Sequence, residues 1–397
     1  MTIVVAPAKI FAPAAPVSED VYGDSDSTLY GSARNQRFVL EQVGHNVFGD
    51  SSILAGSAIG GRDTLTVTGY GGVSGDAGTM VGSSRGGNDT LRVTAGTFAD
   101  GHAMGVAGDT GYMHDRALGG NDTITAQGYV VVSGDTAATM AEHTRGGNDT
   151  IHVIGDGDSE VLGDARTLRD DARGGNDRIT FEGDAFIVCG DARYLFDDSV
   201  GGNDRITIAG SAPFAIVGDA LTLVYFSTGY DPSATARGGN DQLVSTYAGG
   251  SAMAGDATLI AGLGRGGNDT LIGGDGGDVL RGDAGEMRDG SSGGSDVLAG
   301  GKGDDLLYGD AETWTSTGAT GADRFVFAAD SGKDTIGDFE TGKDRIDVSA
   351  LGIASTADFA SFTDDGSDTT ILFSAGNQLT VLGVTTAQLS AGDFIFA

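Results

Sequence analysis

Apolar and polar residues alternate over short stretches that recur along the chain and are separated by glycine-rich turns. Thr-Leu-Arg-Val-Thr (90–94) and Arg-Ile-Thr-Ile (205–208) alternate with a period of two, which predicts strands with one buried face. A second kind of apolar stretch, such as Phe-Ile-Val-Cys (186–189), leads directly into a Gly-Asp pair. The pattern therefore predicts an all-β fold made of many short strands.

Two sequence markers repeat with a nearly constant period. Gly-Gly-Asn-Asp, or a close relative, follows a Gly-Asp pair by eleven residues in seven of nine cases. Self-similarity with a period of about 20–50 residues is typical of solenoids, in which each repeat forms one coil. Leaving aside stray copies such as Gly183-Asp184, the Gly-Asp pairs that are followed by a small residue begin at positions 23, 49, 75, 108, 134, 163, 190, 218, 255, 282 and 309.

Two undisturbed nonapeptides identify the kind of solenoid. Residues 273–281 read GGDGGDVLR and residues 300–308 read GGKGDDLLY, and both match G-G-x-G-x-D-x-U-x, where U is a large apolar residue. This is the calcium-binding repeat of RTX (repeats-in-toxin, hemolysin-type) proteins, so the chain resembles the RTX family over about residues 21–350. The resemblance implies a right-handed parallel β-roll or β-helix, with a calcium ladder along one edge and a β-rich C-terminal cap.

The coil expected here is longer than the RTX coil of two nonapeptides. A period of about 27 residues leaves room for an 18-residue coil and a flap of about nine residues inserted between the two markers. An apolar residue recurs five places after the glycine of most Gly-Asp pairs, and we expect it to stack as a third core ladder; an exposed binding stripe is the alternative. These residues are Leu54, Met80, Met113, Leu168, Leu195, Leu223, Ile260, Met287 and Trp314.

The glycines and aspartates together suit calcium, which takes six to eight oxygen ligands from carboxylates and backbone carbonyls. Glycine lets a turn aim its carbonyls at one point, and aspartate adds the charged ligand. The first ligand candidates close each Gly-Gly-Asn-Asp unit or hold the same place in the nonapeptides. They are Asp63, Asp89, Asp122, Asp149, Asp177, Asp204, Asp241, Asp269, Asp278, Asp296 and Asp305, together with Asp323 of the segment that follows.

The aspartate of each Gly-Asp pair is the second ligand candidate. A turn aspartate that accepts hydrogen bonds from local backbone N–H groups is the alternative interpretation of this position. The residues concerned are Asp50, Asp76, Asp109, Asp135, Asp164, Asp191, Asp219, Asp256, Asp283 and Asp310.

The two edges of the solenoid are expected to differ. In the nonapeptide an aspartate stands two residues before the large apolar residue. In most coils, the strand that leads into Gly-Asp has no aspartate at this place and has instead Met104, Val130, Phe186 or Phe214. We expect one edge to be a calcium ladder and the other to be closed by apolar packing until the last coils. Carboxylates stacked at a strand spacing of about 4.8 Å repel one another, so folding is expected to depend on calcium.

Composition supports cations as partners. The chain has 23 Lys and Arg against 56 Asp and Glu, a net charge of −33, which disfavours nucleic acid and anionic membranes. The single cysteine, Cys189, excludes an internal disulfide framework. No run of about 20 apolar residues predicts a membrane-spanning helix.

The C-terminal region has its own resemblance. GADRFVFAADSGKDTIGDFETGKDRIDVSAL (321–351) resembles the segment that follows the repeats in serralysin-type proteases. This implies a cap on the β-roll and a C-terminal signal read by type I secretion machinery, hence an extracellular protein exported without an N-terminal signal peptide. The expected organisation is a flexible segment at 1–20, a degenerate capping coil at 21–48, the calcium-binding RTX solenoid at 49–320, and the cap and secretion signal at 321–397.

Enzymatic motifs are weak. The zinc-protease motif His-Glu-x-x-His does not occur, and Gly-x-Ser-x-Gly at 82–86 and 290–294 falls in flaps instead of a strand-to-helix elbow. Gly-Tyr-Asp-Pro-Ser (229–233) resembles an active-site motif of mannuronan epimerases, but Ser233 stands where a histidine should follow the proline. Threonines such as Thr64 would suit an ice-binding face, yet Arg92 and other basic residues interrupt the rows.

We therefore expect a secreted, non-enzymatic, calcium-binding protein that folds outside the cell. Its role would be structural, adhesive or interactive, with cell-surface polysaccharide or self-assembly as candidate partners. A polysaccharide-modifying enzyme of the alginate epimerase or lyase type, built on a β-helix, is the alternative.

Overall fold

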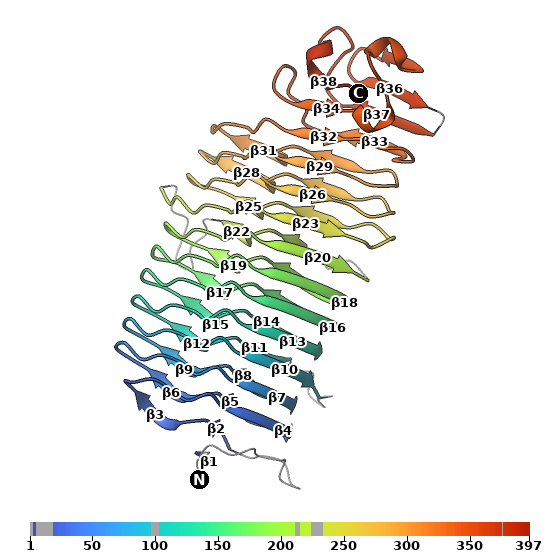
Figure 1. The fold of residues 1–397 in the computed structure, drawn as a ribbon. Helices are drawn as coiled ribbons and strands as arrows, with labels where there is room; N and C mark the ends of the chain where they lie inside the picture. The colour runs from blue at the N-terminus through green and yellow to red at the C-terminus, as the bar shows by residue number, and fades with distance from the viewer. Residues whose placement is uncertain (1–2, 5–18, 97–102, 211–214, 224–232, 375) are drawn as a thin grey trace. The chain divides into compact units, whose positions relative to one another are not determined.

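The computed structural model of the chain describes residues 3–4, 19–96, 103–210, 215–223, 233–374 and 376–397. The chain divides into two compact units, Met1–Arg205 and Ile206–Ala397, referred to below as the first and second units. The described residues form strands and three short 3-10 turns, and none of their helices is long and apolar enough to cross a membrane. Within each unit, successive coils stack as parallel rungs (Figure 1), so the expected all-β parallel solenoid is confirmed.

A coil of the first unit consists of three short strands. One follows the Gly-Gly-Asn-Asp turn, one precedes Gly-Asp, and one follows it into the flap. Each strand pairs in parallel with the equivalent strand of the next coil, so that Leu91 lies opposite Ile124 and Met80 opposite Met113. The register places each residue of one coil over the same motif position of the next.

The strands of the first unit fall into three sets by their place in the coil. Those after the Gly-Gly-Asn-Asp turn are β4 (Arg37–Val43), β7 (Thr64–Gly69), β10 (Thr90–Ala95), β13 (Thr123–Gly128), β16 (Thr150–Leu162) and β18 (Arg178–Cys189). Those that lead into Gly-Asp are β2 (Val21–Tyr22), which also pairs with β1 (Ile3–Val4), β5 (Val47–Phe48), β8 (Gly72–Ser74), β11 (Met104–Ala107) and β14 (Val130–Ser133). Those in the flap are β3 (Ser25–Leu29), β6 (Ser51–Leu54), β9 (Ala77–Met80), β12 (Thr110–Met113), β15 (Thr136–Met140), β17 (Ala165–Leu168) and β19 (Ala192–Leu195).

The second unit repeats the same plan with shorter strands. After the Gly-Gly-Asn-Asp turn come β20 (Arg205–Ala209), β23 (Gln242–Ser245), β26 (Thr270–Ile272), β29 (Val297–Ala299) and β32 (Arg324–Val326). Before Gly-Asp come β21 (Ala215–Val217), β24 (Ala252–Ala254), β27 (Val279–Arg281) and β30 (Leu306–Tyr308). The flap strands are β22 (Ala220–Leu223), β25 (Ala257–Ile260), β28 (Ala284–Asp289) and β31 (Ala311–Ser316).

Antiparallel strands and aromatic side chains close the C-terminal end of the second unit. β36 pairs in antiparallel fashion with β35 and β37, which ends the parallel stacking. Phe359 packs against Phe373 and Phe394, with ring centroids 5.6 and 5.3 Å apart. The elements are β33 (Lys333–Ile336), β34 (Arg345–Asp347), η1 (Ser349–Leu351), η2 (Thr356–Asp358), β35 (Ser361–Asp364), β36 (Thr369–Ser374), β37 (Asn377–Val381), η3 (Ala391–Asp393) and β38 (Phe394–Ile395).

The core consists of stacked apolar ladders. Leu65, Leu91 and Ile124 are fully buried in successive strands after the Gly-Gly-Asn-Asp turn, and the expected flap ladder is buried beside them. The flap residues from Leu54 to Met287 therefore belong to the core. Trp314 is only partly buried, because β31 is the last strand of its sheet and no further flap packs over it.

The second edge is closed by apolar packing only in part of the first unit. Met104 and Val130 are fully buried, as expected, but Phe186 is 40% exposed, so its predicted place in the core is wrong. In the pairing of β16 with β18, Ser159 lies opposite Ala185 and Glu160 opposite Ile187, which leaves Phe186 as the extra residue of a bulge. Phe214 lies outside the described residues, as does nearly all of the expected flexible segment 1–20. The domain boundaries remain predictions.

The flap ladder predicts a large effect of truncating one of its members. Met80→Ala leaves a cavity between the side chains stacked above and below it, and should lower the free energy of unfolding by about 2–5 kcal/mol. Chemical denaturation in saturating calcium measures this. Thr79→Ala, in the same strand but only half-buried, is the control and should cost less than about 1 kcal/mol. Equal losses in the two variants would show that the flap is not part of the core.

Candidate metal centre

The aspartate of each Gly-Asp pair joins the two turns of its own coil. Gly87 donates its backbone N–H to Asp76 Oδ2 at 2.8 Å, and Gly175 donates to Asp164 Oδ1 at 2.9 Å. These aspartates are buried from Asp50 to Asp310, whereas Asp24 of the first coil is partly exposed. The eleven-residue spacing of the two sequence markers is therefore the spacing at which this hydrogen bond forms. The Gly-Asp aspartate thus accepts a backbone hydrogen bond, as the alternative interpretation of this position expected.

The aspartate that closes each Gly-Gly-Asn-Asp turn joins neighbouring coils. Asp89 donates its backbone N–H to Asp122 Oδ1 at 2.6 Å, and Asp122 donates in the same way to Asp149 Oδ1 at 2.6 Å. The same bond links Asp241 to Asp269 in the second unit, at 2.6 Å. Each carboxylate is thereby fixed through one oxygen.

The other oxygen of these carboxylates has a different environment. It is buried and accepts no hydrogen bond within the described part of the chain. A buried carboxylate oxygen without a donor costs free energy unless a cation or a proton satisfies it. The oxygen concerned is Oδ2 of Asp63, Asp89, Asp122, Asp149, Asp177, Asp269, Asp296, Asp305 and Asp323.

The glycine of Gly-Asp leaves the space into which this second oxygen points. A Cβ atom built on Gly108 would lie 2.1 Å from Asp122 Oδ2 and 1.7 Å from the carbonyl oxygen of Gly134 in the next coil. At Gly75 the corresponding distances, to Asp89 Oδ2 and the Gly108 carbonyl, are 2.1 and 1.8 Å. A side chain would fill a cradle that now brings together one carboxylate and one carbonyl oxygen.

A second cradle lies at the first glycine of Gly-Gly-Asn-Asp, where the Gly-Asp carboxylates of two coils converge. A Cβ on Gly174 would lie 1.7 Å from Asp191 Oδ1 and 2.5 Å from Asp164 Oδ2. Gly266 has the same relation to Asp283 and Asp256, at 1.9 and 2.5 Å. Each coil thus contributes to two columns of cradles on one edge.

Burial and like charge make these carboxyls poor acids. Burial raises the pKa of Asp63 to about 10, with further increases from the charges of Asp50 and Asp89. Burial also raises the pKa of Asp256 to about 7, although Gly267 donates a hydrogen bond to it. Asp122 has a pKa well above the usual range because of burial and then the charge of Asp149. The folded columns therefore need protons or cations.

The donor set fits calcium better than a transition metal. Within the described residues, no three Asp, Glu, His or Cys side chains gather into a group that could hold a metal. A cation in these cradles would be held by one or two carboxylates and completed by backbone carbonyls. Calcium accepts carbonyl ligands and flexible geometry, whereas zinc and copper favour histidine and cysteine. The residues present therefore fit Ca²⁺.

A short column also forms on the second edge in the last coils. Ser251 donates its backbone N–H to Asp278 Oδ1 at 2.5 Å, and Asp278 donates to Asp305 Oδ1 at 2.8 Å. Asp305 in turn donates to Asp334 Oδ1 at 3.1 Å. Burial raises the pKa of Asp305 to about 6 and that of Asp334 to about 7. On this edge, aspartates therefore replace apolar packing in the coils that contain the two intact nonapeptides, as the sequence predicted.

Sequence reasoning missed three aspartates that extend the columns beyond the repeats. Asp338 accepts the N–H groups of Gly309 and Asp310 at 2.7 and 3.0 Å, and Asp344 Oδ1 accepts that of Asp323 at 3.0 Å. Asp334, on the second edge, is the third. Both Asp334 and Asp344 stand two residues before a buried isoleucine, the D-x-U part of the nonapeptide, and this shorter signal would have identified them.

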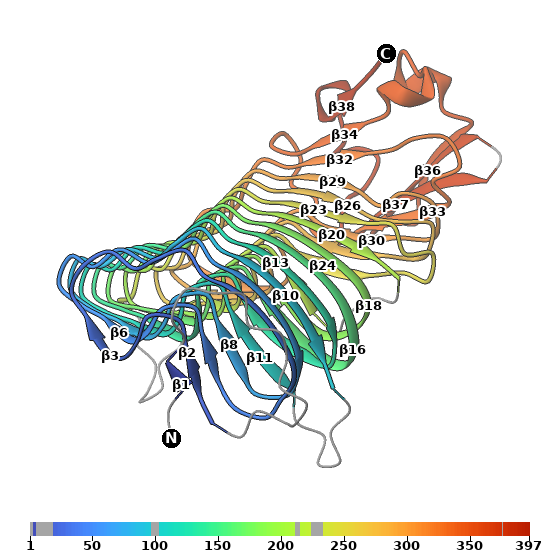
Figure 2. The ribbon, with the colours of Figure 1, turned by 60° about the horizontal axis from the view of Figure 1, so that its bottom comes forward.

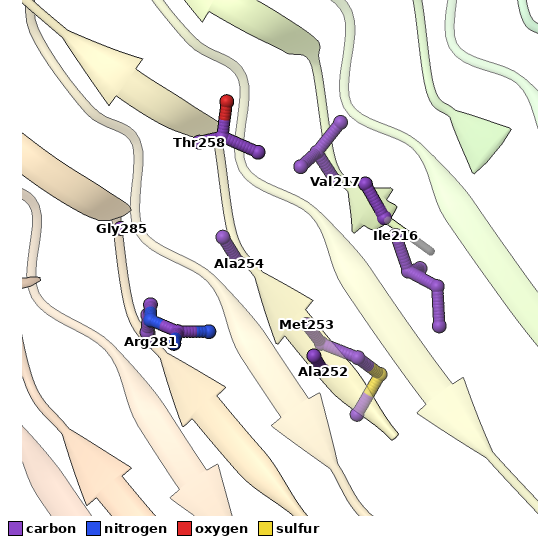
Figure 3. Close-up of a pocket in the computed structure, with 9 residues that line it drawn as sticks. Ile216, Val217, Ala252, Met253, Ala254, Thr258, Arg281 and Gly285 are labelled. Carbon is purple, nitrogen blue, oxygen red and sulfur yellow. The ribbon is translucent and has the colours of Figure 1, made fainter. Parts of the chain in front are cut away.

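The described residues of the candidate enzyme motifs form no catalytic arrangement. Ser84 of the first Gly-x-Ser-x-Gly match is fully buried, and Ser292 of the second match is half-buried. Gly-Tyr-Asp-Pro-Ser lies outside the described residues except for Ser233. The second unit has a groove of about 270 Å³ beside β21, β24 and β27 (Figure 3). Its described lining includes no acid, histidine or cysteine, and Arg281 is engaged by Glu312.

The raised pKa values predict how pH acts on the calcium-free chain. A carboxyl with a raised pKa in the folded state stabilises that state below its unfolded pKa, near 3.9, and loses this contribution as pH rises through the folded pKa. For Asp50, Asp256 and Asp63 the folded pKa values are about 6, 7 and 10. In a chelator, far-UV circular dichroism should show more strand at about pH 5 than at about pH 8. A strand content that rises with pH in the chelator would contradict this.

Comparison with known families agrees with the geometry of the second unit. Residues 241–397 match the family model described as peptidase M10 serralysin C terminal. The match begins at Asp241, the last residue of a Gly-Gly-Asn-Asp turn, and extends through the cap. No curated protein matches the chain. The expected serralysin-type resemblance is confirmed for this region: residues 241–397 are similar to the C-terminal segment of peptidase M10 serralysins.

Proposed function

We propose that this chain is a secreted solenoid that binds several Ca²⁺ ions in its aspartate columns and folds when it meets calcium outside the cell. The observation that supports this best is the repeated cradle in which a buried carboxylate oxygen without a hydrogen-bond donor lies beside a backbone carbonyl. The match of residues 241–397 to the serralysin C-terminal family agrees with it.

The chain's own groups prepare each cradle. Backbone N–H groups hold one carboxylate oxygen, as Asp89 holds Asp122 Oδ1, and so direct the second oxygen inward. Glycine keeps the space open, and its carbonyl adds an uncharged ligand from the next coil. Calcium, when bound, supplies the positive charge that the columns lack. Stacking of coils and binding of ions then become one cooperative process.

Sites of low calcium affinity are sufficient for folding to begin only outside the cell. Extracellular calcium modules bind at about 10⁻⁴–10⁻³ M, so the columns would stay empty at low cytosolic calcium and fill outside the cell. Without cations the carboxylates at successive coils repel at a strand spacing of about 4.8 Å. The chain would therefore remain loosely folded during export by a type I secretion machine.

A non-enzymatic role in structure, adhesion or interaction is the function we favour. The alternative, an epimerase or lyase acting on alginate, needs an acid and a base at a binding cleft. The groove of Figure 3 offers neither among its described lining residues. Product formation from alginate in the presence of calcium would establish the alternative.

Calcium titration tests the proposal directly. Circular dichroism should change from coil to strand at millimolar calcium, and magnesium should not substitute because it demands a smaller octahedral site. Gly174→Ala places a methyl group in the cradle of Asp191 and Asp164, and should raise the calcium midpoint about tenfold or more. Gly105→Ala is the matched control, since a Cβ there meets nothing within 4 Å. A spectrum that is the same in chelator and in calcium would refute the proposal.

Export can be tested without disturbing the solenoid. Residues 321–397 fused to a cytosolic carrier protein should direct it to the medium when a type I transporter is co-expressed. The control is an equally long fusion of residues 239–315, which carries the repeats without the C-terminal segment. Retention of the first fusion, or export of both, would show that the secretion signal lies elsewhere.

A further inference from the structure

Several arginines of the first unit lie on the outside of the coils at related positions of the repeat. The residue before each Gly-Gly-Asn-Asp turn forms a ladder of parallel bridges in which Arg85, Leu118, Arg145 and Arg173 follow one another. All three arginines are exposed. The ladder residues belong to the segments that lead from each flap into the strand after the Gly-Gly-Asn-Asp turn. Figure 2 shows these segments stacked from coil to coil.

Further arginines lie on the adjoining outward rows. Arg92 lies opposite Thr66 and Thr125 on the exposed positions of its strand, and Arg178 lies opposite Thr150. We call this set of exposed residues the arginine face. It comprises Arg62, Arg85, Arg92, Arg145, Arg173 and Arg178.

These guanidinium groups have no carboxylate partner among the residues that the structure describes. Within the described residues, no carboxylate lies within 4.0 Å of any arginine of the face, whereas Arg169 and Arg193, elsewhere in the first unit, have acidic partners. Arg145 and Arg173 are neighbours in successive coils, so their charges repel unless an anion lies between them. In a chain with 56 acidic residues, such unpaired cations indicate an external anionic ligand.

The polar residues between the arginines are held in fixed positions. Asn176 donates its backbone N–H and its side-chain amide to Asn148 Oδ1, both at 2.9 Å. Asn148 is bound in the same way to Asn121, at 2.7 and 3.1 Å. Together with the outward threonines, this asparagine ladder offers hydrogen bonds to hydroxyl groups at the repeat of the coils.

We propose that the arginine face binds a linear acidic polysaccharide, with uronate carboxylates on the arginines and sugar hydroxyls on the asparagine and threonine rows. Arg145 and Arg173, in adjacent coils, lie one strand spacing apart, about 4.8 Å, which suits an extended polymer carrying one carboxylate per sugar. Guanidinium binds carboxylates through two parallel hydrogen bonds. The inference rests on the calcium-folded solenoid of the proposed function, because only stacked coils align the arginines.

Nucleic acid is the less suitable polyanion. Double-stranded DNA carries one charge per about 1.7 Å, and a chain of net charge −33 repels such a density at long range. A polyuronate has a lower charge density and many neutral hydroxyl groups. The arginines, with the asparagine and threonine rows beside them, match this combination of charged and neutral groups.

The test uses the calcium-loaded full chain and fluorescently labelled polymannuronate. Polarisation titrations should show binding that weakens with salt. The variant Arg145→Gln with Arg173→Gln should bind about tenfold more weakly. Arg166→Gln with Arg169→Gln removes the same charge from exposed positions off the face and should change the affinity less than about twofold.

Three results would overturn the inference: no binding of polymannuronate by the folded chain, equal losses in the two double variants, or equally tight binding of neutral dextran or a DNA duplex. Circular dichroism of the same samples separates this inference from the proposed function. A spectrum that does not respond to calcium counts against the proposed function, whereas a folded chain that ignores polymannuronate counts against the arginine face alone.

Discussion

The repulsion between buried carboxylates stacked from coil to coil governs this structure. Each repeat after the first coil brings two aspartates to the same edge, where burial and neighbouring charge raise the pKa of residues such as Asp122 well above the usual range. Apolar ladders alone would favour stacking, but the columns oppose it unless protons or cations neutralise them. The stability of the solenoid is therefore linked to the concentration of a second species, which a core of ordinary side chains would not require.

Hydrogen bonding explains why the two sequence markers keep their spacing while other parts of the repeat vary. The bond from the Gly-Gly-Asn-Asp turn to the Gly-Asp carboxylate closes over eleven residues in most coils, as from Gly87 to Asp76. It persists when the flap is longer, since Gly239 donates to Asp219 across 20 residues at 2.8 Å. Insertions that keep the two turns together leave the cradles intact.

Much of this arrangement could be predicted from the sequence because its causes are periodic. The marker spacing predicted both aspartate columns, and the apolar positions predicted the flap ladder. Phe186 was misplaced because a bulge moves one residue out of register without changing the motif spacing. Asp338 and Asp344 were missed because the paired markers do not continue after the last repeat: Gly337-Asp338 has no Gly-Gly-Asn-Asp turn eleven residues later, and Asp344 keeps only the D-x-U part of the nonapeptide.

The first coil shows how the column ends without a cation. Gln36 stands where the following coils have a ladder aspartate, and its backbone N–H binds Asp63 Oδ1 at 2.6 Å. Its side-chain amide donates to Asp24 Oδ1 at 3.0 Å, and the Arg34 guanidinium lies 3.9 Å from the same oxygen. Protein groups therefore take over the neutralising role at this end, which limits the charge that must be compensated.

The pleat of the strands separates the two kinds of charge. Carboxylates of the columns are buried, whereas the arginines occupy exposed positions of the coils. Filling the columns with divalent cations would cancel much of the net charge of −33 without touching the outer arginines. Calcium would then affect an anionic partner in two ways, because it aligns the arginine face and also removes the long-range repulsion that keeps polyanions away.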